Sequence, residues 1–283
     1  MIPAKWRIPL KFARAMARVS GVCLDDQTPT LQKFILIANQ RTGSTWIIDL
    51  LNSHPHITAY SELFHGANYG RPKVGGNRDI LVWNSYAASQ GSPRGRLERM
   101  RLCFQYLDEE VYRPRNGSGA AGFKLMYNQA AFEIYLLAYL KVRRVSVIHL
   151  IRRNHLAGIL SEEAVLVRNV AHAQAGSAVA PVQFELDTHT LITRLQARAQ
   201  SVREAQDFLS QMGTPYSEIY YEDLREDASG IQETMRVLGV DATDFEPSSS
   251  LQKLNPTDHR QLIENYDEVH ELLKGTAFFD QLH

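Results

Sequence analysis

The sequence is poor in the residues that build disulfide or metal-held frameworks. Its 283 residues include only two cysteines, Cys23 and Cys103, and neither stands in a CxxC motif or in a cysteine and histidine cluster. We therefore expect no disulfide framework and no metal site. So few cysteines are typical of a reducing compartment, which predicts a cytoplasmic protein.

Long apolar runs and an excess of one charge are also missing. No apolar stretch approaches the roughly 20 residues that cross a bilayer, and the N-terminus lacks the continuous apolar segment of a secretion signal. Lysine plus arginine and aspartate plus glutamate number 31 each, so no nucleic-acid partner is expected. The 44% hydrophobic content is enough for a buried core.

The N-terminal segment, residues 1–30, differs from the rest of the chain. Residues 5–18 carry five basic side chains and no acidic one, and most of them gather on one side of a helical wheel, opposite apolar residues. Two interpretations stay open. The commoner one is a surface helix packed on its own domain, and the other is a basic amphipathic helix that contacts a membrane surface.

Residues 31–283 alternate between buried strands and helical patterns. The clearest strands are 34–38 and 145–151, with shorter ones near 121–125 and at 216–221. Helices are predicted at 46–51, 97–111, 129–140, 154–169, 188–212, 228–238 and 259–274. This alternation predicts one α/β domain, a doubly wound parallel sheet flanked by helices.

The first strand runs into the loop NQRTGST, residues 39–45. A loop between a strand and a helix offers free backbone N–H groups at the positive end of the helix dipole, which favours an anion. Gly43 lets the backbone approach a ligand because it has no Cβ. The triphosphate loop GxxxxGK[ST] has a lysine that is missing here, and Arg41 is the loop's only cation. The loop is therefore P-loop-like, with an ordinary capped turn as the alternative.

The second strand ends at a further arginine. Arg153 follows it directly, and Ser161 lies eight residues further on. An arginine and a hydroxyl near a helix start can share a phosphate. Ligands of open α/β sheets bind at the carboxyl ends of the strands. We therefore expect both turns to face one crevice.

Taken in order, these segments resemble a known family. QRTGSTW, HPHITAYSELF, GFKLMYNQ, VIHLIRRN with a following serine, and IYYEDL with VLGV are similar to the PAPS-dependent sulfotransferases. The likeness is greatest to the bacterial carbohydrate branch of nodulation-factor, lipopolysaccharide and trehalose sulfotransferases, and it covers about residues 33–276. It implies a P-loop-like fold, 3′-phosphoadenosine-5′-phosphosulfate (PAPS) as the sulfonate donor, and a small-molecule or glycolipid acceptor.

The resemblance also implies roles for individual residues. The 5′-phosphosulfate would be held by Arg41, Thr42, Gly43, Ser44 and Thr45, with Arg41 where many members have lysine. Arg153 and Ser161 would bind the 3′-phosphate. Lys253, in LQKLNP, lies where relatives close a loop over the nucleotide. A donor without β and γ phosphates is consistent with the missing triphosphate lysine.

In-line sulfonyl transfer requires donors for the phosphosulfate oxygens and a base for the acceptor hydroxyl, and in principle no metal. We interpret Glu62, after a predicted edge strand, as the general base, with a surface ion pair to Arg41 or Arg71 as the alternative. Lys124 is flanked by apolar residues, so its ammonium either reaches an anion and stabilises the sulfonate or extends to solvent. His54 is a weaker candidate for the base.

Two other functions stay open. A P-loop kinase or NTPase is disfavoured by the missing GK[ST] and by HLIRR where a metal-binding aspartate is expected. A non-catalytic relative would bind the nucleotide without turnover. Acceptor specificity is expected to reside in residues 65–96 and 171–185.

Overall fold

The computed structural model describes residues 31–64, 80–91, 93–115, 117–132, 134–174, 176–177, 179–227 and 229–282. The basic segment 1–30, Arg71 and the first part of the 65–96 segment lie outside these described residues. Among the helices that are described, none combines the length and apolar character that crossing a bilayer requires.

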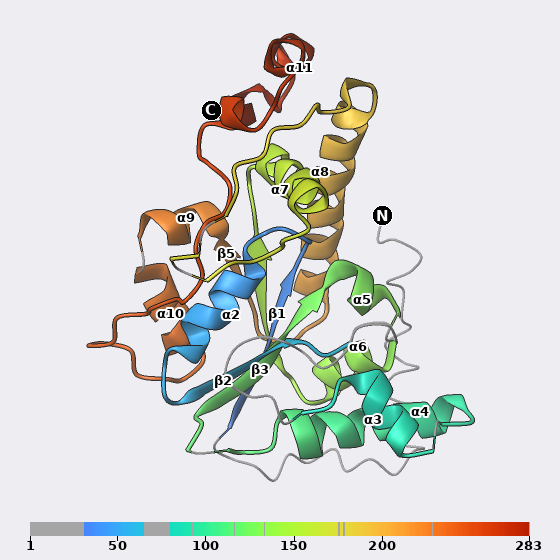
Figure 1. Ribbon diagram of the computed structural model, residues 1–283. Coiled ribbons are helices and arrows are strands. Elements are labelled where there is room, and N and C mark those ends of the chain that lie inside the picture. The colour runs from blue at the N-terminus through green and yellow to red at the C-terminus, as the bar shows by residue number, and fades with distance from the viewer. Residues whose placement is uncertain are drawn as a thin grey trace.

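A five-stranded parallel sheet forms the centre of a single α/β domain (Figure 1). Its strands run in the order β2-β3-β1-β4-β5, so β1 is central and β2 is an edge strand. The strand bounds are β1 Gln32–Ala38, β2 Ile57–Glu62, β3 Ala120–Met126, β4 Ser146–Ile151 and β5 Tyr216–Tyr220. The predicted doubly wound parallel sheet is confirmed. The carboxyl end of β1 lies between those of β3 and β4, where sheets of this kind bind ligands.

Helices cover both faces of this sheet, and β1 contributes side chains to the hydrophobic core on each face. Phe34 and Leu36 pack on the face covered by α2 (Ser44–Asn52) and α10 (Ser229–Val237). Ile35 and Ile37 point to the opposite face, because successive side chains of a strand alternate. That face is covered by α4 (Arg96–Tyr106), α6 (Ile134–Val142) and the C-terminal half of α8 (Thr188–Gln211). Burial on both faces explains the continuous apolar run in the sequence.

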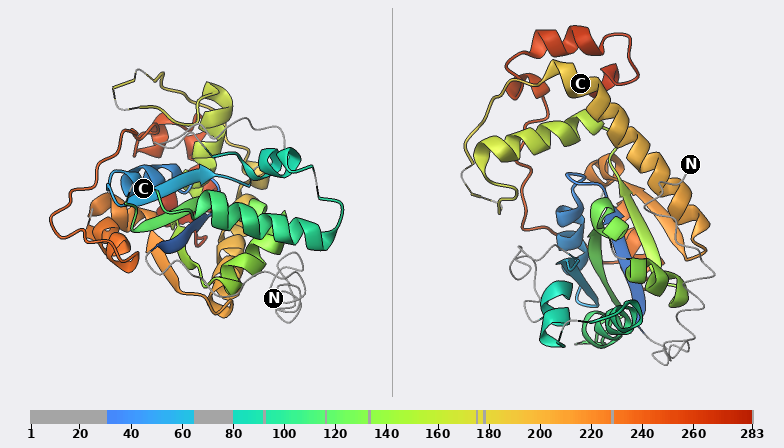
Figure 2. Two further views of the ribbon diagram at one scale, coloured as in Figure 1. Left: turned by 90° about the horizontal axis from the view of Figure 1, so that it is seen from below. Right: turned by 90° about the vertical axis from the view of Figure 1, so that its right-hand side faces the viewer.

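A third group of helices stands beyond the carboxyl ends of the strands (Figures 1 and 2). It contains α7 (His155–Arg168), the N-terminal half of α8 and α11 (Tyr266–Leu273), which share their own core around Leu160 and Leu191. The loops that leave β1 and β4 therefore lie between the sheet and this helical group.

The remaining elements differ from the predicted bounds in places. They are α3 (Trp83–Ser89), the π-helical turn η2 (Leu107–Val111), α5 (Tyr127–Phe132), α9 (Tyr221–Glu226), and the 3-10 turns η3 (His259–Gln261) and η4 (Phe279–Leu282). The helix predicted at 97–111 changes to a π-helical turn after Tyr106, and the one at 259–274 is split into η3 and α11. Tyr221, interpreted as the end of a strand, begins α9 instead, where two acidic residues in the first turn favour a helix start.

Candidate active site

The loop between β1 and α2 presents a row of unused backbone donors. Arg41 and Gly43 have positive φ angles of 59° and 84°. Among the described residues, the N–H groups of residues 41–45 donate to no acceptor. Three of these groups precede the helix and two belong to its first turn, where N–H groups have no partner within the helix. Consecutive free N–H groups of this kind form an anion-binding loop.

Gly43 is required at its position for two reasons. Its φ of 84° is a left-handed conformation, and a Cβ atom there would lie 2.4 Å from the ring of Tyr221. Tyr221 comes from α9 and also contacts the ring of Trp46, with 5.8 Å between the ring centroids. The C-terminal third of the chain thus packs directly on the anion-binding loop, a contact that sequence reasoning missed.

Arg41 extends from the loop toward α7. Its Nε donates to Ser161 Oγ at 3.0 Å, and its Nη2 donates to the carbonyl of Ala171 at 3.1 Å. Burial lowers the pKa of Arg41, and the negative charge of Glu162 partly raises it again. The guanidinium group stays charged, as in arginines generally. The structure therefore places Ser161 beside the first loop.

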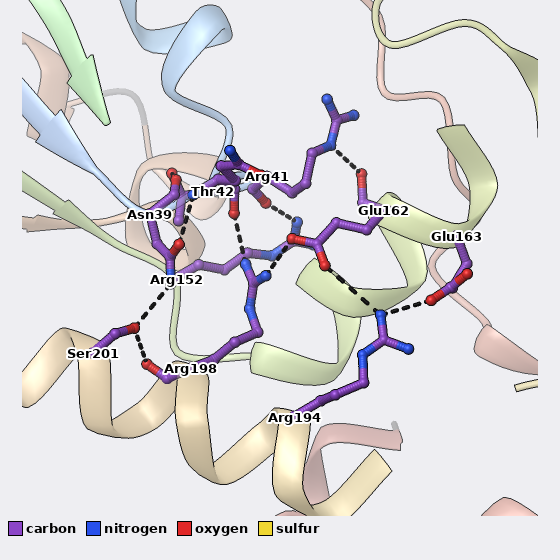
Figure 3. A network of polar contacts seen from close by, with 11 residues as sticks. Asn39, Arg41, Thr42, Arg152, Glu162, Glu163, Arg194, Arg198 and Ser201 are labelled. Carbon is purple, nitrogen blue, oxygen red and sulfur yellow. Dashed lines mark hydrogen bonds and ion pairs between the residues drawn. The ribbon is translucent and has the colours of Figure 1, made fainter. Parts of the chain in front are cut away.

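Two further arginines surround this loop (Figure 3). Arg152 Nη1 donates to the carbonyl of Arg41 at 3.0 Å, and Arg198 Nη2 donates to the carbonyl of Gln40 at 2.6 Å. Arg198 also forms an ion pair of 2.5 Å with Glu162. Neither arginine was singled out from the sequence, because Arg152 only precedes the selected Arg153 and Arg198 lies within a long helix.

The carboxyl ends of β2 and β3 add a buried ion pair. Lys124 Nζ lies 2.8 Å from Glu62 Oε1, and the two side chains are 6% and 17% exposed. The same ammonium donates to Thr45 Oγ1 at 3.0 Å, and Gln129 Nε2 donates to Glu62 Oε2 at 2.6 Å. Of the alternatives for Lys124, the ammonium reaches an anion and does not extend to solvent. Glu62 forms an ion pair, as the alternative predicted, but its partner is Lys124. The Glu62 carboxylate lies close to the anion-binding loop through this lysine.

His172 joins this cluster from the segment after α7. Its Nε2 lies 3.3 Å from Thr45 Oγ1. Loss of water around the ring, followed by the charges of Arg41 and Lys124, lowers the pKa of His172. Although the residue as a whole is exposed, its ring lies against the loop and close to these two cations. The sequence indicated only that the 171–185 segment matters.

A partly buried network of polar side chains connects α5 with β4 and β5. Tyr127 and His149 are joined at 2.5 Å, His149 and Tyr216 at 2.8 Å, and the Tyr216 hydroxyl donates to Glu218 at 2.6 Å. Burial lowers the pKa of His149 to about 4. Tyr127 begins α5, the helix that carries Gln129. The network thus anchors the helix that holds Glu62.

Arg153 and Ser161 are not brought together. The Arg153 guanidinium forms a forked ion pair with Asp223, lies 4.0 Å from the ring centroid of Tyr220, and its side chain is 51% exposed. Eight residues rise about 12 Å along a helix, which separates the two side chains. Both belong to the carboxyl end of the sheet, but Ser161 faces Arg41 and Arg153 faces α9.

The C-terminal candidate, Lys253, lies in a segment that contacts the one carrying His172. Lys253 is exposed and donates to Thr257 Oγ1 at 2.9 Å. Its neighbour Gln252 donates its backbone N–H to the carbonyl of Ala173 at 3.1 Å, which joins the C-terminal segment to the one that carries His172. His54 is buried at the opposite end of the sheet, before β2, so it is remote from Glu62.

Comparisons with known proteins give only distant likenesses, and these are to solved structures. No protein-family model matches the chain, and no curated protein matches it. Among solved structures, the crystal structure of a sulfotransferase from Alicyclobacillus acidocaldarius is similar, with 16% sequence identity and a TM-score of 0.44. The likeness covers 89% of this chain and 94% of that chain. At this identity and TM-score it does not decide the function of this chain.

Proposed function

We propose that this chain is a sulfotransferase that moves a sulfonate group from PAPS to a hydroxyl of a carbohydrate or glycolipid-type acceptor. One observation carries the proposal. Lys124 is buried between Thr45 of the anion loop and the carboxylate of Glu62. These contacts join an anion-binding loop, a buried positive charge and a carboxylate that can act as a base.

The donor side of the site fits a phosphosulfate. The free N–H groups of residues 41–45 and the guanidinium of Arg41 are donors for its non-bridging oxygens. The present acceptors of Arg41 are a hydroxyl and a carbonyl, which are uncharged, so an anion is the better partner. The ordered motifs that resemble PAPS-dependent sulfotransferases support this choice of donor.

The chemical step needs one proton acceptor and several charge-stabilising donors. The acceptor oxygen attacks sulfur while its proton passes to the Glu62 carboxylate. The bond between sulfur and the bridging oxygen breaks, and its electron pair leaves with the 5′-phosphate of adenosine 3′,5′-bisphosphate. Lys124 has three N–H donors, so it can hold the sulfonate oxygens while it remains near Glu62. Its charge then stabilises the transferring group.

The 3′-phosphate is assigned to Arg153 and Ser161 on the resemblance alone. Binding there requires Arg153 to release Asp223. That ion pair lies at the surface, with side chains 51% and 57% exposed, where water and salt screen the attraction and the pair adds little stability. The rearrangement is therefore inexpensive compared with the charge-assisted contacts that a phosphate would make.

Thermal unfolding with different nucleotides tests the donor class. Adenosine 3′,5′-bisphosphate without magnesium should raise the unfolding temperature, since a ligand at 100 times its Kd stabilises by about 2.7 kcal/mol. A rise only with ATP and magnesium would instead indicate a kinase or NTPase. A panel of sugar and glycolipid acceptors with labelled PAPS then tests transfer. Binding of the bisphosphate without transfer to any acceptor would favour a non-catalytic relative.

A further inference from the structure

Two consecutive carbonyl groups of the anion loop are each held by an arginine from a distant element. Arg152, at the end of β4, donates to the carbonyl of Arg41, and Arg198, on α8, donates to the carbonyl of Gln40. These partners are 111 and 158 residues apart in the chain. Figure 3 shows the Arg198 side chain reaching toward the loop from its helix, with the Arg152 side chain beside it.

The direction of these carbonyls fixes the direction of the loop's donors. No peptide bond among the described residues is cis, and in a trans peptide the C=O and N–H groups point in opposite directions. The N–H groups of Arg41 and Thr42 therefore point away from the two guanidinium groups. The left-handed conformation of Arg41, with φ of 59°, costs about 1 kcal/mol or more for a residue with a Cβ. An external contact has to hold it.

Both arginines are themselves fixed in place. Arg152 lies 4.8 Å from the ring centroid of Tyr221, the residue that also packs on Gly43. The Arg198 side chain is only 12% exposed, pairs with Glu162, and packs on Gly158 so closely that a Cβ there would lie 2.7 Å from Nη2. Both arginine side chains are thus packed against other residues, unlike arginines that extend into solvent.

We propose that Arg152 and Arg198 are positioning residues, which clamp the carbonyls of Gln40 and Arg41 so that the loop keeps its N–H groups turned toward an anion. This rests on the proposed function and deepens it. The two residues act through the loop backbone and do not touch the donor. The competing explanation is that they merely add positive charge near the site.

Arg194 provides a matched control for this competing explanation. It lies one helical turn before Arg198 on the same face of α8 and pairs with Glu163 at 2.6 Å and with Glu162 at 3.8 Å. Among the described residues it donates to neither loop carbonyl. Its removal takes away the same charge from the same acidic cluster but leaves the loop contacts intact.

The test compares Arg198→Met with Arg194→Met in the full chain. Inorganic pyrophosphate and adenosine 3′,5′-bisphosphate are titrated by calorimetry at low salt and at 0.5 M NaCl. We expect Arg198→Met to lower the affinity for both anions by about tenfold or more. This loss should persist in high salt, because salt screens charges but does not change the orientation of the loop. Arg194→Met should lower the affinity for both anions by less than about threefold, and high salt should remove this loss of affinity. Arg198→Lys should recover part of the affinity.

Several results would overturn the clamp. One is an equal loss in the two methionine variants that vanishes in high salt, and another is unchanged anion affinity in Arg198→Met. If Arg198→Met fails to fold, Arg198→Lys is the deciding variant. It keeps the charge but cannot reach Glu162 and the Gln40 carbonyl with two separate N–H groups of one planar guanidinium, so it should still bind both anions several-fold more weakly. If the wild-type chain binds pyrophosphate but not adenosine 3′,5′-bisphosphate, the PAPS proposal is refuted. The pyrophosphate affinities of the variants then still test the clamp. Binding of neither anion refutes both.

Discussion

The carboxyl ends of β1 and β4 each carry an arginine that the sequence assigned to a phosphate, but the two arginines have different partners. Arg41 is half-buried and donates to a hydroxyl and a carbonyl. Arg153 is exposed and paired with the carboxylate of Asp223. An anion displaces neutral acceptors easily, whereas it has to compete with a carboxylate. Under the proposed function, the β1 end would bind its phosphate without losing an ion pair, whereas the β4 end would first have to release one.

The largest expected effect tests the chemistry at the β1 side. Glu62→Gln should reduce sulfonyl transfer by about 10² to 10⁴, the range of a lost general base, while the Kd for adenosine 3′,5′-bisphosphate changes by less than about threefold. Labelled PAPS and calorimetry measure the two quantities. Glu163→Gln, which alters a carboxylate on α7 outside this cluster, is the control. A Glu62→Gln variant with full rate would show that the base is elsewhere.

A substitution at Gly43 tests how tightly the β1 loop is fixed. Gly43→Ala should destabilise the fold by about 3 kcal/mol, from the left-handed backbone and the collision with Tyr221, and should abolish anion binding. Gly91→Ala is the matched control, because its φ is 88° and nothing lies within 4 Å of the added Cβ. It should cost only about 1 kcal/mol. Denaturant unfolding of both variants measures the difference, and equal losses would contradict the packing role of Tyr221.

Acidification tests the buried part of β4. An unfolded histidine binds its proton near pH 6.5, whereas His149 in the fold does so only at a pKa of about 4. The unfolded state therefore binds more protons between these values, so stability falls as the pH drops from about 6.5 to about 4. The loss should reach at most about 3 kcal/mol. Urea unfolding across this range measures it, and His149→Asn should have a flatter profile. A parallel profile would assign the effect to other groups.

Removal of one cation from each side compares the two ends directly. Lys124→Met takes the ammonium from a largely buried carboxylate and should cost about 2 kcal/mol, somewhat below the range for fully buried pairs. Arg153→Met breaks an exposed, solvent-screened pair and should change the free energy of unfolding far less than Lys124→Met does. Urea unfolding of the two variants is the measurement. If the order were reversed, the contrast between the two ends would be wrong.

The smallest effect concerns the release of Arg153. Asp223→Asn removes the charge that competes for Arg153, so it should lower the Kd for adenosine 3′,5′-bisphosphate by about two- to fivefold. Adenosine 5′-monophosphate has no 3′-phosphate and should bind with unchanged affinity, which calorimetry can check. Equal tightening of both nucleotides would mean that Asp223 acts on the site in general, and the 3′-phosphate would then have to bind elsewhere.

The sequence was most informative where function depends on local order. The strand, loop and helix around Gly43 follow from periodicity, and Glu62 was placed at the end of an edge strand, as the structure shows. The spacing of Arg153 and Ser161 was less informative, because Arg153 precedes α7 and turns toward α9, whereas Ser161 within α7 faces Arg41. His172, Arg198 and Tyr221 reach the loop only through packing between segments distant in sequence, and no local pattern marks such contacts.

The central position of β1 has a consequence for how the protein is made. This strand leaves the ribosome before both of its partners, which begin at Ala120 and Ser146. The arginine that holds the carbonyl of Gln40 is synthesised 158 residues later. Pairings of such long range form slowly. A nascent chain halted before α8 would contain every residue of the NQRTGST loop and still lack the side chain that completes its shape.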